Sequence, residues 1–392
     1  MTTNVKIFRS TDPGAAAYTL YGNAPGSTGG AGGWIGVLRA CLISGYGGKT
    51  ASTATVASTV VTFTSTAHGF IPGQCLLLAG ATGDSATPIN GERYVVAITV
   101  DTFTFVAPAH ADGATAGTLT AKVAPAGWTE PYSPTTTNIT CFKQGAGNGF
   151  YFNIDETAVQ VSRVAGFESM TSCNVANGTG SFPTAALLAG GLSWNRGSTS
   201  NTTAVAWTVI ATDRHLYMYV NNTSSPTGID GMFMGMTDLK VYRTGDVFAT
   251  LIMGGANTTT TSNNSGHATI AGIASVVTGH FFPRSFTQIG SCVQGAKNTI
   301  DALSGANTTL GSVGMAFPMP VDNGLWLSKT RAWEPSYPRG EIPGLWGPLH
   351  IKPLVHLDTL VGTGDLAGKT FMVFNGFTAG QLMMEISNTW SI

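Results

Sequence analysis

The chain has 392 residues, which is too long for one ordinary hydrophobic core and predicts two or three domains. Asp, Glu, Lys and Arg make up 10% of the residues, against roughly 25% in an average soluble protein, while 43% are apolar and 51 are glycine. The net charge of -1 and the scattered Lys and Arg residues provide no basic surface for nucleic acid, and no apolar run is long enough to span a membrane.

The N-terminal part, residues 1–50, consists of an arm and a helix that we expect to belong to the main core. The arm, residues 1–32, is rich in glycine and poor in charge, and it could wrap its own domain or reach a neighbour. The helix is predicted from apolar residues at helical spacing, Trp34, Ile35, Leu38, Cys41 and Leu42. Gly45 supplies a stop signal at its C-terminal end.

Residues 51–123 differ in character and read as a complete small β module. Short β-branched or aromatic runs such as "TVVTFTSTAHGF" and "INGERYVVAITVDTFTFV" alternate with Gly, Pro and Asn-Gly turn signals. Their alternating apolar faces predict a compact sandwich or barrel. Both ends must lie close together if this module is inserted in a loop of another domain.

The remainder, residues 124–392, predicts a main core domain that is also rich in β-strands. Strands are expected at "NGFYFNID", "TAVQVSRVAGF", "AVAWTVIATD", "RHLYMYVN", "DVFATLIMGG", "GLWLSKT", "KTFMVFNG" and "GQLMMEIS". The segment 267–279 fits either a helix or a buried strand. The predicted fold class is therefore mainly β, a sandwich-like or barrel-like core with one N-terminal helix and an inserted small β domain.

The five cysteines, Cys41, Cys75, Cys141, Cys173 and Cys292, are odd in number and lack a C-x-x-C pair. We expect free thiols, mostly buried. The N-terminus lacks the basic and apolar regions of a secretory signal, so a soluble protein made in a reducing cytosol is expected.

Several segments in chain order resemble a family of virion structural proteins from tailed bacteriophages. These segments are "VKIFRSTDPGA", "IGVLRACLISGYGGKTA", "AGWTEPYS", "CFKQGAGNGFYFNIDETA", "RVAGFESMT", "WTVIATDRHLYMYV", "YRTGDVFATLIMGG" and "LAGKTFMVFNG". The resemblance covers nearly all of the chain outside 51–123. In family members the helix and the "GWT" segment follow almost directly. Residues 51–123 look like the small Ig-like or barrel modules that phage structural proteins carry, and would be an insertion in the loop after the helix, a position where added sequence costs little closure entropy.

Two stretches imitate phosphate-binding signatures. "GTGDLAGKT", 362–370, ends in Gly-Lys-Thr, but the spacing of a P-loop fails by one residue, and the following segment reads as a strand. Gly48-Lys49-Thr50 fails the same test because Ile43 stands where glycine is required. A glycine-rich turn between two strands is the better interpretation of 362–370.

The candidate catalytic groups of the sequence are one Asp–His pair and several carboxylates. Asp213 and His215 would lie on the same side of a strand, yet no Gly-x-Ser-x-Gly elbow supplies a nucleophile, so a turn aspartate and a strand histidine are the better interpretation. Glycoside cleavage needs two facing carboxylates. The candidates can be combined in many ways, and no pair is selected: Asp155, Glu156, Glu168, Asp230, Asp238 and Asp246. The seven histidines show no metal-binding spacing, so no metal or cofactor is expected.

Trp326, Trp333 and Trp346 are the best candidates for a sugar-binding platform. They share a stretch with four prolines, which predicts an ordered, irregular loop packed by its own aromatic rings over 333–348. Core packing is the favoured role for these tryptophans, and an exposed cluster would favour receptor binding.

These observations predict a non-enzymatic structural component of a tailed-phage virion, either a capsid decoration or cement protein or a neck or tail component. The scarcity of charge favours extensive contacts with copies of itself and other virion proteins over a monomer with a Ser/Thr/Asn surface. No nucleic acid or membrane partner is expected. The alternative is a host-surface or glycan-binding virion protein, with or without hydrolytic activity. The candidate subunit-interface residues are Tyr18, Leu20, Tyr21, Trp333 and Trp346.

Overall fold

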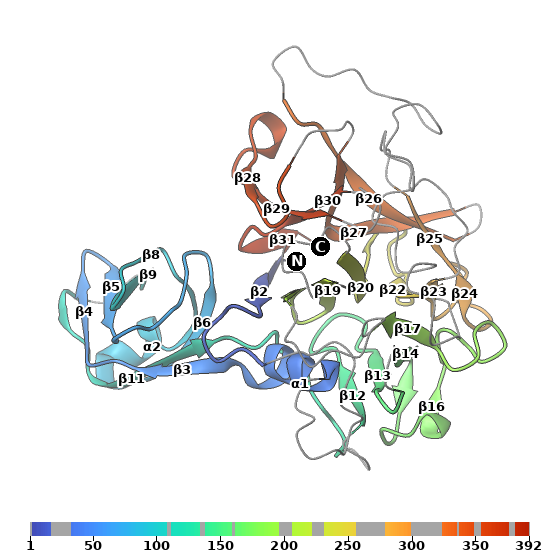
Figure 1. Cartoon of the computed structure of the whole chain (residues 1–392), viewed down its shortest axis with the longest axis horizontal. Coiled ribbons are helices and arrows are strands. Elements are labelled where there is room, and N and C mark those ends of the chain that lie inside the picture. The colour runs from blue at the N-terminus through green and yellow to red at the C-terminus, as the bar shows by residue number, and fades with distance from the viewer. Residues whose placement is uncertain are drawn as a thin grey trace.

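The computed structural model describes residues 2–16, 33–107, 111–133, 138–158, 161–195, 206–221, 231–255, 279–298, 324–334, 337–348, 354–375 and 381–391. The arm residues Tyr18, Leu20 and Tyr21 lie outside this described part, as does nearly all of 267–279. The described chain is mainly β, as the sequence predicts, with antiparallel sheets and few short helices (Figure 1).

A central antiparallel sheet of seven strands forms the middle layer of the core. In spatial order its strands are β2 (Lys6–Arg9), β18 (Trp207–Ala211), β19 (His215–Asn221), β20 (Gly231–Asp238), β22 (Thr250–Met253), β23 (His280–Phe282) and β24 (Val293–Gln294). Both faces of its middle strands are buried: Leu216 and Met218 pack into one hydrophobic cluster, whereas Tyr217 and Tyr219 pack into another. Successive side chains of a strand point to opposite faces, so a strand buried on both sides is mainly apolar.

The C-terminal sheet covers one face of the central sheet. In spatial order it contains β25 (Ala296–Asn298), β26 (Leu327–Glu334), β27 (Tyr337–Pro348), β30 (Gln381–Glu385), β29 (Thr370–Asn375) and β28 (Thr359–Val361), with β21 (Lys240–Val241) also paired to β27. Leu345, Phe374 and Met384 of this sheet pack with Tyr217 and Phe233 of the central sheet. The two ends of the described chain meet here, because β1 (Thr2–Asn4) pairs with β31 (Thr389–Ser391).

A four-stranded sheet and the N-terminal helix cover the other face. The sheet order is β12 (Ile139–Lys143), β13 (Tyr151–Asp155), β14 (Val161–Phe167) and β17 (Leu192–Asn195), and β15 (Ser169–Met170) pairs with β16 (Gly178–Thr179) beside it, joined through the turn η3 (Val175–Asn177). Phe152 and Trp194 of this sheet share a hydrophobic cluster with Met218 of the central sheet. The core is thus three layers deep, with the central sheet in the middle (Figure 1).

The helix is present where the sequence predicts it, as α1 (Trp34–Arg39) continued by the π-helical turn η1 (Ala40–Ser44). Its predicted apolar residues are buried, and Gly45 ends it with φ 68°, a conformation that favours glycine. The backbone N–H groups of Ala126 and Trp128 donate to the Cys41 and Leu42 carbonyls at 2.8 and 3.1 Å. The "GWT" segment therefore docks directly on the helix end.

The small module contains two sheets that extend away from the core (Figure 1). One sheet has the order β10 (Gly113–Ala114), β4 (Thr53–Ala57), β5 (Val60–Thr64), β9 (Thr102–Val106) and β8 (Ala97–Ile98). The other has the order β3 (Tyr46–Thr50), β11 (Gly117–Val123), β6 (Cys75–Ala81) and β7 (Gly91–Tyr94), with η2 (Gly83–Ser85) and α2 (Ala86–Ile89) between β6 and β7. Because β3 pairs with β11, the sheet begins at Tyr46, before the predicted boundary at residue 51.

Polar contacts join the module to the core. Lys6 of the core is nearly buried, and its ammonium group binds the Glu92 carboxylate of β7 and the Pro125 carbonyl. The Tyr94 hydroxyl donates to the Asn388 carbonyl at 2.7 Å. The module is therefore held against the N- and C-terminal strands as well as through its own two ends.

The prediction of an irregular loop at 333–348 is wrong. This stretch forms most of a hairpin made by β26 and β27. Proline has no backbone N–H group, so it interrupts a strand only at a position whose N–H group must donate to the neighbouring strand. Pro343 lies in an irregularity where the register jumps from Trp346, paired with Lys329, to Glu341, paired with Arg331. The hairpin accommodates this proline because the extra residues lie outside the hydrogen-bonded ladder.

The cysteines are all free and buried, as predicted, but two of them are neighbours in space. The sulfur atoms of Cys141 and Cys173 lie 3.5 Å apart in a small cluster with Phe167 and Met170. Within the described residues, no helix combines the length and the apolar character that spanning a membrane requires.

The pairing of β3 with β11 generates a prediction about excision of the module. Tyr46 lies opposite Val123, so the chain enters and leaves the module at adjacent points. Removing residues 46–123 and joining Gly45 to Ala124 should leave a soluble core with one cooperative unfolding transition in calorimetry. Removing 51–123 instead should give a less stable core, since β3 would remain without its partner β11. Aggregation or non-cooperative melting of the 46–123 deletion would show that the module is integral to the core.

Candidate functional site

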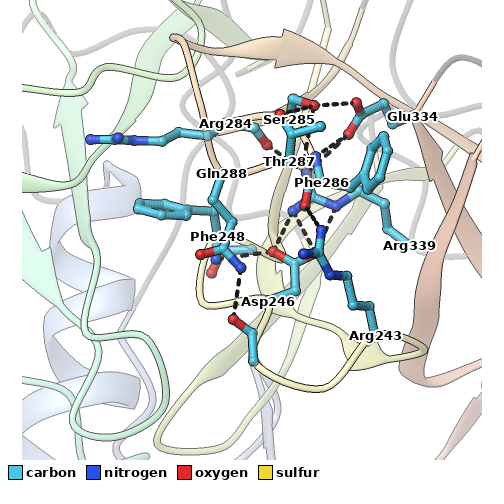
Figure 2. Close-up of polar contacts among 12 residues, drawn as sticks. Arg243, Asp246, Phe248, Arg284, Ser285, Phe286, Thr287, Gln288, Glu334 and Arg339 are labelled. Atoms are coloured by element: carbon cyan, nitrogen blue, oxygen red, sulfur yellow. Dashed lines mark hydrogen bonds and ion pairs between the residues drawn. The ribbon is translucent and has the colours of Figure 1, made fainter.

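The most heavily charged interior region surrounds Arg339 on β27 (Figure 2). Its guanidinium makes a bidentate contact with the Asp246 carboxylate, with nitrogen–oxygen distances of 2.7 to 3.0 Å. Both side chains are almost completely excluded from solvent. The remaining nitrogen donates to the Arg284 carbonyl at 2.6 Å and to Glu334 at 3.4 Å. The guanidinium also lies over the Phe282 ring, 4.4 Å from its centroid.

Glu334 completes this cluster by fixing the loop that follows β23. Its carboxylate accepts hydrogen bonds from the Ser285 hydroxyl and the Phe286 backbone N–H, both at 2.7 Å (Figure 2). Every nitrogen of Arg339 and both oxygens of Glu334 have protein partners. An ion cluster whose polar atoms are all satisfied by the protein holds loops together and offers no free group to a substrate.

A second arginine, Arg284, joins the same loop to the four-stranded sheet side of the core. It donates to both Glu168 oxygens at 2.7 Å, and its guanidinium lies 4.5 Å from the centroid of the Phe248 ring. Hydrogen bonding to Glu168 raises the pKa of Arg284, which therefore remains charged. Glu168, a candidate catalytic acid from the sequence, is used here as an anchor.

The other carboxylate candidates serve similar roles at separate places. Asp238 is buried and accepts hydrogen bonds from Gln144, Asn148 N–H and Thr250, which fix the 144–148 turn to the central sheet. Burial raises the pKa of Asp238. Glu156 accepts from the backbone N–H groups at the start of α1, at 2.6 and 3.2 Å, and so caps the helix. Asp155 accepts from Thr157 N–H, and Asp230 lies outside the described residues.

Asp213 and His215 do not form a catalytic pair. The His215 ring is fully buried, its Nδ1 lies 2.8 Å from the Thr237 hydroxyl, and its centroid lies 5.6 Å from the Trp390 ring. Desolvation lowers the pKa of His215 well below its ordinary value. Asp213 is half-exposed and lies 3.5 Å from its neighbour Arg214. The interpretation of a strand histidine and a turn aspartate is confirmed.

The "GTGDLAGKT" stretch is a turn between antiparallel strands, as predicted, with the short helix η4 (Gly364–Leu366) between β28 and β29. It borders a cleft of about 670 Å³ between the small module and the C-terminal sheet. Lys369 lies in this cleft, and its ammonium group pairs with the Glu385 carboxylate at 2.6 Å. Arg9, Gln74 and Asn388 also line the cleft, whereas no aromatic residue does in the described part of the chain.

The tryptophans considered as a sugar platform do not form an exposed cluster. Trp346 is buried, packs edge-on against Phe371 and donates to Glu385 at 3.2 Å. Trp333 lies half-buried on β26, and Trp326 is 48% exposed just before that strand. Of the five proposed interface residues, only Trp333 and Trp346 belong to the described chain, and Trp346 contributes to the core.

Sequence reasoning did not anticipate the Arg339 cluster or the cleft at Lys369. The partners in each come from segments far apart in the chain, as the separation of 93 positions between Asp246 and Arg339 illustrates. The one local signal was the rarity of charge, since charged residues are almost never fully buried unless they are paired. In the described residues, no three His, Cys, Asp or Glu side chains gather as metal ligands.

Comparison with known proteins gives little further information. No protein-family model matches this chain, and no curated protein matches it. Among solved structures, a chain described as the phage phi92 endosialidase matches with 13% sequence identity and a TM-score of 0.17. The match covers 86% of this chain and 52% of that chain, so the protein spans about half of the endosialidase's length. A likeness at this TM-score carries no argument about fold or function.

The buried ion pairs of Arg339 predict a large loss of stability when the charge of its partner Asp246 is removed. Replacing Asp246 with Asn should lower the free energy of unfolding by about 3–5 kcal/mol, because the guanidinium would stay buried without its counter-charge. Glu168→Gln is the matched control and should cost less, since the Arg284 side chain is 35% exposed. Urea denaturation measures both. Equal losses in the two variants would contradict the assignment of Arg339 as the dominant internal anchor.

The complete burial of the His215 ring predicts that the protein loses stability on acidification. The unfolded chain binds a proton at this ring near pH 6.5, whereas the buried ring in the folded state resists protonation, so the free energy of unfolding should fall as the pH drops below about 6.5. In His215→Gln the slope between pH 6.5 and 5 should be shallower by up to about 1.4 kcal/mol per pH unit. The pKa of His356, lowered by burial to about 4, acts in the same direction and is unchanged in this variant. Identical slopes for the two proteins would contradict the role of His215.

Proposed function

We propose that the protein is a non-enzymatic structural component of a tailed-phage virion that assembles through contacts with copies of itself and with other virion proteins. The observation that carries this proposal is that the candidate catalytic carboxylates bind other groups of the protein itself. Glu156, Glu168, Asp238 and Asp246 each hold a helix, loop or turn in place through hydrogen bonds or ion pairs. Groups engaged in this way are poorly suited to exchange protons with a substrate.

The phage assignment rests on the sequence segments that resemble virion structural proteins. The direct docking of the "GWT" segment on the helix end supports it, because these two segments are nearly contiguous in members of that family. Charges are few, and some of them, such as the Arg339–Asp246 pair, are buried inside the protein. A surface covered mainly by hydroxyl, amide and small apolar groups suits extensive subunit contacts.

A host-surface glycan binder is the second candidate function, and the cleft beside Lys369 is the observation in its favour. The cleft offers a guanidinium from Arg9, the amide of Asn388 and the hydroxyls of Thr370 and Ser387. Such groups can hydrogen-bond to a saccharide. Since no aromatic ring lines the cleft in the described chain, stacking would contribute little to that binding.

Mass spectrometry of purified phage particles tests the proposal and also the placement. We expect the protein in the particle; a copy number on the order of hundreds would indicate the capsid, and a small multiple of three or six would indicate the neck or tail. Its absence from particles that carry the other virion proteins would contradict the proposal.

Polysaccharide assays test the non-enzymatic part. We expect no release of reducing ends from host polysaccharide by the purified protein, and no stoichiometric transition metal in native mass spectrometry. Asp155→Asn is the informative variant, since Asp155 is the least engaged of the described candidates and its replacement should leave the fold intact. Sugar release that disappears in this variant would overturn the non-enzymatic assignment. Glycan binding that weakens in Lys369→Ala without sugar release would favour the second candidate function.

A further inference from the structure

Two buried cysteines lie against each other on the outer face of the four-stranded sheet. Phe142 of β12 packs into the main hydrophobic cluster, so its neighbour Cys141 points to the opposite face. There its sulfur atom lies 3.5 Å from that of Cys173, which follows β15. A disulfide bond holds its two sulfur atoms about 2.05 Å apart. Rotation about the Cα–Cβ bonds of the two cysteines moves both sulfur atoms, so bond formation needs only a short approach within an existing contact.

The side chain of Asn153 holds the backbones of the two cysteines in place. Asn153 lies opposite Cys141 in the pairing of β12 with β13 and is 2% exposed. Its amide nitrogen donates to the Thr140 carbonyl at 3.2 Å and to the Cys173 carbonyl at 2.8 Å. One buried amide therefore ties the segment that carries Cys173 to strand β12. The contact between the two sulfur atoms is thus fixed by the fold.

The cluster around the two cysteines is shallow, so a small reagent can reach it without unfolding of the core. Residues 174–177, directly after Cys173, are exposed and include the short turn η3. Local opening of such a turn costs less free energy than unfolding of a packed sheet. The cluster is separate from the two that pack on the central sheet, and its bordering side chains are only partly buried: Tyr132, Ile139, Tyr151 and Ala165.

Cys141 is the better protected of the two thiols. It lies within β12 and is fully buried. Burial and the neighbouring Cys173 thiol raise the pKa of Cys141, which disfavours its thiolate. Cys173 instead borders the exposed turn η3. We therefore expect Cys173 to react first with an oxidant and Cys141 to react second.

We propose that Cys141 and Cys173 are a redox modification site that closes to an intramolecular disulfide in an oxidising medium and thereby stabilises the fold. The oxidant is a low-molecular-weight disulfide such as oxidised glutathione. The Cys173 thiolate attacks one glutathione sulfur and releases the first glutathione thiolate. The Cys141 thiolate then attacks the Cys173 sulfur of this mixed disulfide and releases the second. The two cysteines are oxidised and lose two protons, while one oxidised glutathione is reduced to two glutathione molecules.

The cross-link would stabilise the part of the chain that forms the four-stranded sheet. It joins positions that are 32 residues apart and encloses β13 and β14. Such a bond restricts the unfolded chain and so favours the folded one. This inference goes beyond the proposed function and does not rest on it. Any passage from a reducing cytosol to an oxidising medium would form the bond after folding.

Peptide mapping of the full-length protein tests the pairing. The reduced protein is incubated under native conditions with oxidised glutathione, its remaining thiols are blocked with N-ethylmaleimide, and it is digested with trypsin. Cleavage after Lys122, Lys143, Arg163 and Arg196 places the two cysteines on separate peptides, 123–143 and 164–196. We expect these peptides to be joined in most molecules and to separate on reduction. Peptides that stay separate, a lasting glutathione adduct on Cys173, or a link to another cysteine overturns the proposal.

Thermal unfolding tests the stabilisation. The oxidised wild type should melt above the reduced wild type by about 5 °C or more. Cys141→Ala and Cys173→Ala should show no such difference, and because each variant is compared with itself, any loss of packing cancels. Cys292→Ala is the matched control, since Cys292 is also buried but lies outside the pair, and it should keep the difference. A wild type without the difference, or a Cys173→Ala variant that keeps it, overturns the proposal.

Oxidation of the unfolded protein distinguishes a site built by the fold from two reactive thiols. In urea the five cysteines are no longer held in place, so oxidation should give mixed links among them. The native protein should give the link between Cys141 and Cys173 alone. The same mixture of links from native and unfolded protein overturns the proposal.

Discussion

The burial of the central sheet on both faces is the constraint on which the rest of the core depends. Strands such as β18 and β19 present side chains alternately to two hydrophobic clusters, so most of their residues are apolar, and the polar residues Thr208 and His215 are buried as well. Two further layers are then required, the C-terminal sheet on one side and the four-stranded sheet with helix α1 on the other. The connections between these layers have to carry their polar backbone groups around a thick apolar interior.

The few charged residues are used to hold those connections. Arg339 joins three segments through Asp246, Glu334 and the Arg284 carbonyl, and Glu156 satisfies the first N–H groups of helix α1. Such charges are tolerated inside because each is paired and hydrogen-bonded. A chain with few charges that buries some of them leaves a weakly charged surface.

The small module is attached so that it leaves the core connections intact. Its entry and exit strands pair with each other, and the segment after it returns to the helix end, where Ala126 and Trp128 bind the Cys41 and Leu42 carbonyls. Two chain ends held side by side add little closure entropy to the parent fold. The module extends to one side of the three-layered core (Figure 1).

The sequence by itself determined the β-rich class, the position of the helix and most strands of the core, because alternation of apolar residues is a local property of the chain. The residues Trp34, Leu38 and Cys41 were correctly assigned to a buried helix face in this way. Only the tertiary structure decided that 333–348 is a hairpin, since a register irregularity beside another strand accommodates Pro343. It also decided which charges meet. Asp246 and Arg339 are 93 positions apart, and their contact depends on the order in which sheets pack, a property that no local pattern encodes.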